Sequence, residues 1–207
     1  MRIAGILLAG GRSTRMGADK MRMRFAGRTL LEHSAQRLRP QVAALAVSAN
    51  APLDLPALDD LPLLPDPLPD YPGPLAGILA GFDWAASLEG VTHLASAAGD
   101  TPFIPQDLVA RLASAVEADP ARIAIAASSG NRHPTCALWP LSLREGLWQY
   151  LQAHESLKVG AFIDRHDAVR VAFAPQKSHA GDFDPFFNVN TPADLARAEE
   201  IAIGAAQ

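Results

Sequence analysis

Short apolar runs of strand length alternate along this chain with longer segments whose apolar residues recur at a helical period. The first run, Ile3–Leu8, is apolar throughout, as expected for a strand covered on both faces, and it is followed by Gly10-Gly11. Such alternation favours a mostly parallel sheet with helices on both faces, because parallel neighbours need a crossover connection. We therefore predict an α/β fold, a single Rossmann-like three-layer domain spanning residues 1–207.

The same patterns predict the remaining elements. Proline at the first helical turn and apolar residues at helical spacing mark the helix that starts at Pro74, and the proline-rich stretch before it reads as a stiff surface loop. No internal repeat and no interdomain linker is evident. Further strands are expected at 43–48, 61–64, 92–97, 122–127, 135–139 and 169–173, and helices at 29–38, 74–88, 105–116, 141–153, 157–164 and 192–203.

Composition excludes several functional classes. The formal net charge is −4, whereas general nucleic-acid binders are usually basic, so we expect no nucleic-acid partner. The single cysteine, Cys136, excludes an internal disulfide framework and a multi-cysteine metal site. A reducing, cytoplasmic location fits that count. No apolar run reaches the ~18 residues that a membrane helix needs, so we expect no membrane association.

The loop after the first strand is the strongest local signal for chemistry. Ligands of such sheets bind outside the carboxyl ends of the strands. Gly10-Gly11 would let backbone N–H groups approach phosphate oxygens closely, and Arg12, Arg15 and Lys20 add positive charge within a chain that is acidic overall. The loop therefore indicates an anion site, with an ordinary solvated loop as the alternative.

Two familiar phosphate motifs do not fit this loop. A P-loop needs four residues between its glycines and a Lys after the second, but five residues separate Gly11 from Gly17, and Ala18 follows. The dinucleotide fingerprint G-x-G-x-x-G is also missing from Gly10-Gly11-Arg12.

Five sequence blocks nevertheless resemble one family. Leu-Ala-Gly-Gly-x-Ser-x-Arg-Met-Gly-x-Asp-Lys at 8–20 is similar to the signature loop of Rossmann-like nucleotidyltransferases, and most of all to that of the molybdenum cofactor guanylyltransferases. The other blocks follow in the family's order and cover nearly the whole chain. They are Asp-Tyr-Pro-Gly-Pro-Leu-Ala-Gly at 70–77, Asp-Thr-Pro-Phe-Ile-Pro at 100–105, His-Pro-Thr at 133–135 and Phe-Asn-Val-Asn-Thr-Pro at 187–192.

The resemblance implies transfer of GMP from GTP to the terminal phosphate of molybdenum-carrying molybdopterin, with release of pyrophosphate and with Mg²⁺ as cofactor. It assigns catalytic roles to Arg15, Lys20 and Asp100; Lys20 would steady the triphosphate and Asp100 would bind the metal. Asp100 directly follows a predicted buried strand, where a carboxylate can reach magnesium, although Asp-Thr-Pro also suits a turn. The implied ligands of the nucleotide are Leu8, Ala9, Gly10, Gly11, Lys20, Ser48, Asn50, Asp66, Asp100 and Asn190.

Three of these assignments have alternatives. Asp66 could simply form a turn between prolines. Ser48 departs from an Asn-x-Asn pattern of some relatives, and a hydroxyl cannot offer the paired hydrogen bonds of an amide. Asn190 could cap the last helix, alone or in addition to a role in the site, and the sequence does not decide whether Asn188 or Asn190 serves the site. His133 could line the pterin side or be structural.

Two other functions stay open at this point. A sister cytidylyltransferase would act on the same pterin, although Gly10-Gly11 favours guanine. A non-catalytic carrier of pterin or nucleotide would not need Lys20 or Asp100. The resemblance also implies transient contacts with molybdenum-cofactor proteins or apo-molybdoenzymes. Oligomeric state and the detailed pterin ligands cannot be predicted from the sequence.

Overall fold

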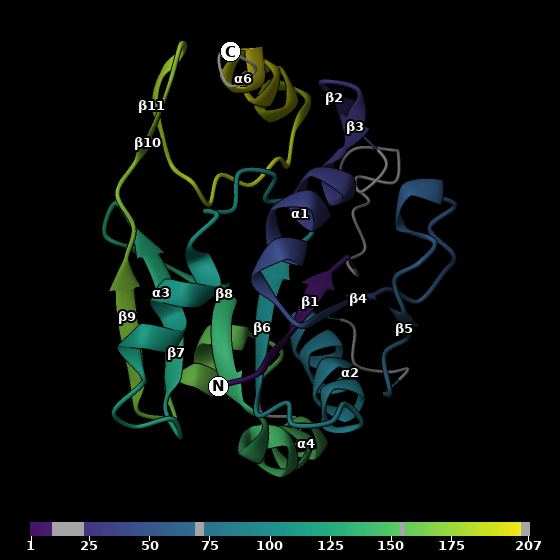
Figure 1. The fold of residues 1–207 in the computed structure, drawn as a ribbon, viewed down its shortest axis with the longest axis vertical. Helices are drawn as coiled ribbons and strands as arrows, with labels where there is room; N and C mark the ends of the chain where they lie inside the picture. Colours follow the sequence, from purple (N-terminus) through teal and green to yellow (C-terminus); the bar gives the residue numbers. More distant parts are fainter. Residues whose placement is uncertain (10–22, 69–72, 154–155, 204–207) are drawn as a thin grey trace.

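The computed structural model describes residues 1–9, 23–68, 73–153 and 156–203. Its centre is a seven-stranded sheet with the strand order β5-β4-β1-β6-β8-β7-β9 (Figure 1). All neighbouring pairs are parallel except those that involve β8. The strands are β1 (Ile3–Leu8), β4 (Ala44–Ser48), β5 (Leu63–Leu64), β6 (His93–Ala98), β7 (Ile123–Ser128), β8 (Asn131–Pro140) and β9 (Ala168–Ala172).

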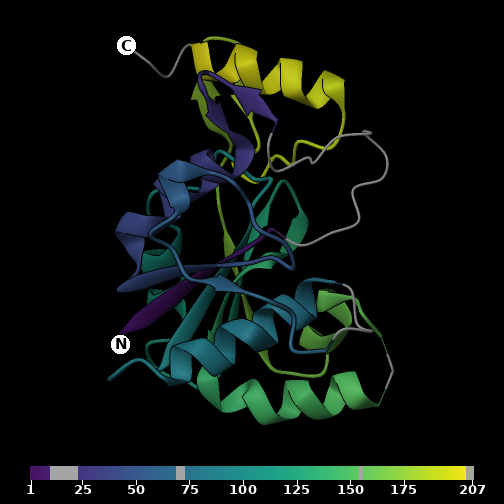
Figure 2. The ribbon, with the colours of Figure 1, turned by 90° about the vertical axis from the view of Figure 1, so that its right-hand side faces the viewer.

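Helices cover both faces of this sheet. On one face α1 packs on β1 and α3 packs on β7, β8 and β9; on the other face α2 packs on β1 and α5 packs on β8. Leu7 belongs to the first of these two cores and Ile6 and Leu8 to the second, because side chains alternate along β1. The fourth helix lies outside α2, as Figure 2 shows. The predicted α/β class with a mostly parallel sheet is confirmed. The helices are α1 (Leu30–Leu38), α2 (Pro74–Ala86), α3 (Leu108–Ala115), α4 (Arg144–Gln152), α5 (Val159–Ile163) and α6 (Pro192–Ile203), with single turns η3 (Arg39–Gln41), η4 (Pro56–Leu58) and η5 (Leu141–Leu143).

One strand runs against the others. β8 lies between β6 and β7 and is antiparallel to both. A two-residue turn joins β7 to β8, with positive φ at Ser129 (48°) and Gly130 (80°), which is the geometry of a tight hairpin. The strand is also longer than the predicted 135–139. As a result, the beginning of β8 lies at the edge of the sheet where the parallel strands end.

Two small hairpins were not predicted. β2 (Arg24–Phe25) pairs with β3 (Arg28–Thr29), and β10 (Gln176–Ser178) pairs with β11 (Gly181–Phe183) where the sequence indicated only a loop. Both lie with α6 above the carboxyl edge of the sheet (Figure 1). A separate apolar cluster joins these parts; its buried members are Phe25, Leu30, Phe103, Val189, Ala198 and Ile201.

No helix within the described ranges combines the length and apolar character needed to cross a membrane. The extent of the domain over residues 1–207 stays a prediction.

Candidate active site

Hydrogen bonds between the ends of neighbouring strands hold the carboxyl edge of the sheet together. The Ala9 N–H donates to the carbonyl of Ser48 at 3.0 Å, and the Gly99 N–H donates to the carbonyl of Leu8 at 3.0 Å. The ends of β4, β1 and β6 therefore meet side by side, and the predicted site residues Leu8, Ala9, Ser48 and Asp100 come together there. The predicted phosphate ligands Gly10, Gly11, Arg15 and Lys20 lie outside the described residues.

Asn50 and Asp66 form a reciprocal pair beyond β4 and β5. The Asn50 Nδ2 donates to Asp66 Oδ2 at 2.8 Å, and the Asp66 N–H donates to Asn50 Oδ1 at 2.7 Å. The Ala49 N–H also donates to the carbonyl of Leu64 at 3.0 Å, which continues the pairing of the two strands toward these residues. The position of Asp66 is therefore set by Asn50, and its role as a nucleotide ligand stays a prediction.

Ser48 is packed tightly against helix α2. Its side chain is buried, with 2% exposed. A Cβ atom added to Gly77 would lie 2.5 Å from Ser48 Oγ and 3.0 Å from Leu8 Cδ2. Because real Cβ atoms do not approach other atoms that closely, glycine is required at position 77 for α2 to pack on the ends of β1 and β4.

The turn that presents Asp100 is held from two sides. Ser34 of α1 is fully buried, and its Oγ lies 3.1 Å from the carbonyl oxygens of both Gly99 and Thr101. From the other side, the Val189 N–H donates to the carbonyl of Asp100 at 3.1 Å. Asp100 itself is half-buried at the edge of the sheet. Ser34 was missed in the sequence because its partners lie 65 and 67 residues away.

The two asparagines of the last block have different surroundings. Thr101 Oγ1 donates to Asn188 Oδ1 at 2.5 Å, so the Asn188 amide lies beside the Asp100 turn. The N–H of Asn190 donates to Asp194 at 2.9 Å. The expectation that Asn190 caps the last helix is wrong, because Thr191 does so: its Oγ1 accepts from the Asp194 N–H at 3.1 Å, and its own N–H donates to the Asp194 carboxylate at 2.8 Å.

The oxygen donors at this edge suit magnesium. Asp100 supplies a carboxylate and Asn188 an amide oxygen, and magnesium prefers such ligands. No group of three or more His, Cys, Asp or Glu side chains with metal-site geometry occurs among the described residues. Magnesium in phosphoryl-transfer sites is commonly held by one or two carboxylates together with substrate phosphates and water, so the donor set fits the ion.

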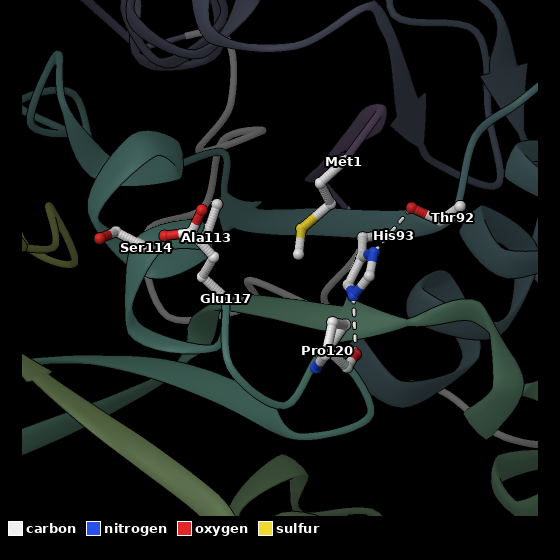
Figure 3. Close-up of a pocket in the computed structure, with 7 residues that line it drawn as sticks. All are labelled: Met1, Thr92, His93, Ala113, Ser114, Glu117 and Pro120. Atoms are coloured by element: carbon white, nitrogen blue, oxygen red, sulfur yellow. Dashed lines mark hydrogen bonds between the residues drawn. The ribbon is translucent and has the colours of Figure 1, made fainter.

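A cavity of about 570 Å³ lies at the opposite edge of the sheet, between the start of β6 and the end of α3 (Figure 3). His93 lines it, but both ring nitrogens are occupied: Nδ1 lies 2.9 Å from Thr92 Oγ1 and Nε2 lies 2.8 Å from the carbonyl oxygen of Pro120. Burial lowers the pKa of His93. This histidine ties the loop before β7 to β6, and the cavity is remote from the carboxyl edge.

Solved structures share this architecture. The chain resembles molybdopterin-guanine dinucleotide biosynthesis protein A from Archaeoglobus fulgidus (TM-score 0.75, 24% identity, 98% of this chain and 99% of that chain). It also resembles 2-C-methyl-D-erythritol 4-phosphate cytidylyltransferase from Thermus thermophilus (TM-score 0.65, 18% identity, 96% and 98%). These likenesses show the fold, a single α/β domain built on a mostly parallel sheet.

Sequence similarity is more specific. The family model described as MobA-like NTP transferase domain matches residues 5–169. A molybdenum cofactor guanylyltransferase of Rhizobium johnstonii is 46% identical over 197 residues, which is 95% of this chain and 91% of the relative. The chain belongs to the MobA-like NTP transferase family, and it is a nucleotidyltransferase enzyme.

Proposed function

We propose that this enzyme transfers GMP from GTP to molybdenum-molybdopterin, which yields the molybdopterin guanine dinucleotide cofactor and pyrophosphate. The observation that carries the proposal is the 46% identity, over 95% of the chain, to a curated molybdenum cofactor guanylyltransferase. The arrangement of the carboxyl edge supports it, because Ser48, Asp66 and Asp100 belong to neighbouring strand ends on one side of the sheet.

In this proposal, the order of the strands sets where each substrate would bind along the carboxyl edge of the sheet. Asp66 lies just beyond β5 and would contact the base and ribose of GTP, whereas the Ser48 side chain is buried against α2 and would support the end of β4. Leu8 and Ala9 end β1, where the phosphates would begin. Asp100 follows β6 and would bind Mg²⁺ together with Asn188. When bound, the ion neutralises the charge that develops on the phosphate oxygens.

The chain's own groups would orient the triphosphate. Gly10 and Gly11 would offer backbone N–H groups, and Arg15 and Lys20 would offer positive charge to the same phosphates. Because Ser34 and Val189 hold the backbone of the turn that carries Asp100, this turn would be formed before substrate arrives, which is what catalysis by positioning requires. The acceptor would approach from the far side of Asp100. The cofactor product would then pass to apo-molybdoenzymes through transient contacts.

A nucleotide-binding experiment tests the proposal and its nearest competitor. Calorimetry with GTP, CTP and ATP, each with and without Mg²⁺, should give the tightest binding for GTP with Mg²⁺. Tighter binding of CTP would instead make the enzyme a cytidylyltransferase for the same pterin.

A transfer assay separates the enzyme from a carrier. Asp100→Ala should lower guanylyl transfer by on the order of 10²–10³, comparable to the loss of one preorganised electrostatic group. The matched control is Asp119→Ala, because Asp119 is an exposed aspartate in the loop before β7, at the opposite edge of the sheet. Equal transfer by both variants would exclude Asp100 from the reaction.

A further inference from the structure

Three polar side chains that the proposed function does not use meet at the ends of β7 and β8. Ser128 Oγ lies 2.6 Å from His133 Nε2 and 2.7 Å from each carboxylate oxygen of Asp184. The Phe186 N–H also donates to Asp184 Oδ1 at 2.8 Å, and the Phe186 ring stacks on His133 with 4.5 Å between ring centroids. The imidazole is thus held by a hydrogen bond at its Nε2 and by an aromatic ring against its face.

The distances assign the hydrogen atoms. Ser128 has one hydroxyl hydrogen, and it donates this hydrogen to the Asp184 carboxylate at 2.7 Å. The hydroxyl oxygen must then accept from His133, so Nε2 of the imidazole carries a hydrogen whether the ring is neutral or charged. None of the described residues forms a hydrogen bond with Nδ1 of His133, and the side chain is 19% exposed. Within the described residues, Nδ1 is therefore the ring nitrogen left for a ligand.

Topology puts His133 on the far side of Asp100 from the proposed nucleotide ligands. Along the carboxyl edge the order is β4, β1, β6 and β8, and neighbouring strands are about 4.8 Å apart. Ser96 pairs with Ala137, and its Oγ donates to the carbonyl of Thr135 at 2.8 Å, so the start of β8 lies beside the end of β6.

Two further observations place the cluster near Asp100. The chain that leaves Asp184 reaches the Asp100 turn within five residues, where the Val189 N–H donates to the Asp100 carbonyl. The buried Cys136 thiol lies within the electrostatic reach of both carboxylates: burial first, and then the charges of Asp100 and Asp184, raise its pKa to about 12. Asp100 and the cluster therefore flank the same short piece of β8.

We propose that His133 binds the terminal phosphate of the acceptor through Nδ1, and that Ser128 and Asp184 are positioning residues that fix the ring. This inference rests on the proposed function. In that reaction an oxygen of the acceptor phosphate forms a bond to the α-phosphorus of GTP, and the bond from the α-phosphorus to the bridging oxygen breaks, with its electron pair leaving on pyrophosphate. A proton remaining on the acceptor phosphate is shared with Nδ1, which Asp184 supports through Ser128.

Two substitutions at position 133 test the contact. His133→Gln can keep a donor near Nε2 for Ser128 but removes Nδ1, whereas His133→Asn keeps an amide near Nδ1 and loses the contact with Ser128. We expect His133→Gln to raise the KM for the molybdopterin acceptor by on the order of 10- to 100-fold, the range for a lost charge-assisted hydrogen bond, with the Kd for GTP unchanged. His133→Asn should retain more acceptor affinity. Wild-type acceptor KM in a folded His133→Gln protein would overturn the proposal.

The positioning role has its own readout. Ser128→Ala leaves the ring in place but cuts its link to Asp184, so it should raise the acceptor KM by less than His133→Gln does. In the double variant Ser128→Ala adds nothing to the effect of His133→Gln, because both act through one contact. Additive effects would mean that Ser128 is only structural. Absence of guanylyl transfer by the wild-type enzyme would contradict the proposed function itself, whereas transfer that is insensitive to His133 contradicts only this inference.

Discussion

Asn50 holds Asp66 with both polar atoms of its carboxamide, donating from Nδ2 at 2.8 Å and accepting at Oδ1 at 2.7 Å. The first bond fixes one carboxylate oxygen of Asp66, and the second fixes the backbone that carries it. Asn50 was predicted to be a ligand of the nucleotide. That direct contact stays a prediction, and the two hydrogen bonds add a second expectation, that Asn50 acts on the nucleotide through Asp66.

Asn50→Ala should therefore weaken GTP binding through Asp66. Loss of two hydrogen bonds of about 0.5–1.5 kcal/mol each, at a partly exposed site, predicts roughly tenfold weaker binding. Calorimetry on Asn50→Ala, Asp66→Ala and the double variant measures the coupling. We expect Asp66→Ala to cost less affinity in the Asn50→Ala background than in the wild type. Fully additive effects would show that Asn50 contacts the nucleotide independently.

Ser34→Ala should loosen the turn that presents Asp100. Its hydroxyl is fully buried and lies 3.1 Å from the carbonyl oxygens of Gly99 and Thr101 and from that of Leu30 in its own helix. Removing a buried hydrogen bond of this kind destabilises a protein by about 1–3 kcal/mol. We expect a lower midpoint in urea unfolding and slower guanylyl transfer at saturating GTP. A variant with reduced stability but full transfer would show that the turn keeps Asp100 in place without Ser34.

Gly77→Ala should damage both stability and nucleotide binding. The new methyl group would lie 2.5 Å from Ser48 Oγ, and crowding of this kind costs about 1–3 kcal/mol. The double variant Gly77→Ala/Ser48→Gly should recover most of the stability, because the clashing side chain is removed. Gly146 of α4 is the matched control, since nothing lies within 4 Å of a Cβ added there. Gly146→Ala should stabilise the protein by about 0.4–1 kcal/mol.

The Cys136 thiol should be inert in the folded protein. Burial raises its pKa from 9.0 to about 12, so at pH 8 only about one molecule in 10⁴ carries the reactive thiolate. A thiol reagent should label Cys136 only after unfolding.

The same shift predicts a pH effect on stability. The folded pKa lies above the unfolded value, so the stabilisation is complete below pH 9 and is lost progressively between pH 9 and 12. Urea unfolding of Cys136→Ala beside the wild type checks this, because the variant should lose less stability across that interval. In the labelling experiment described above, rapid modification of Cys136 in the native protein would contradict the burial of its thiol.

Elements with a clear local signal could be predicted from the sequence. β1 and α6 have the predicted bounds, because an uninterrupted apolar run defines the first and a Thr-Pro start defines the second. The direction of β8 was not foreseen, although only two residues separate β7 from β8, too few for a crossover to a parallel strand. The strands of the β2–β3 and β10–β11 hairpins have two or three residues each, which is too short for any alternation to be read.

The site residues also divide into those with a local sequence signal and those without one. Asp66 and Asp100 were assigned from short motifs of neighbouring residues, and their roles stay predictions. Ser34, Ser128 and Asp184 were not, because their partners are distant in the sequence: Ser128 and Asp184 are 56 residues apart. Such residues acquire a role only when the fold brings them together. The assignments to Arg15 and Lys20 stay predictions.

The reversed direction of β8 divides the working edge of the sheet into two parts that can vary separately. On one side of β6, the groups assigned to the nucleotide follow the ends of the parallel strands β5, β4 and β1. On the other side, His133 stands just after a two-residue hairpin tip. A longer or shorter turn between β7 and β8 would change how far this hairpin extends over the acceptor, without shifting β4 or β1. The boundary between β6 and β8 therefore separates the strands assigned to the nucleotide from the strand assigned to the acceptor. The same nucleotide site could be combined there with acceptor sites of different size.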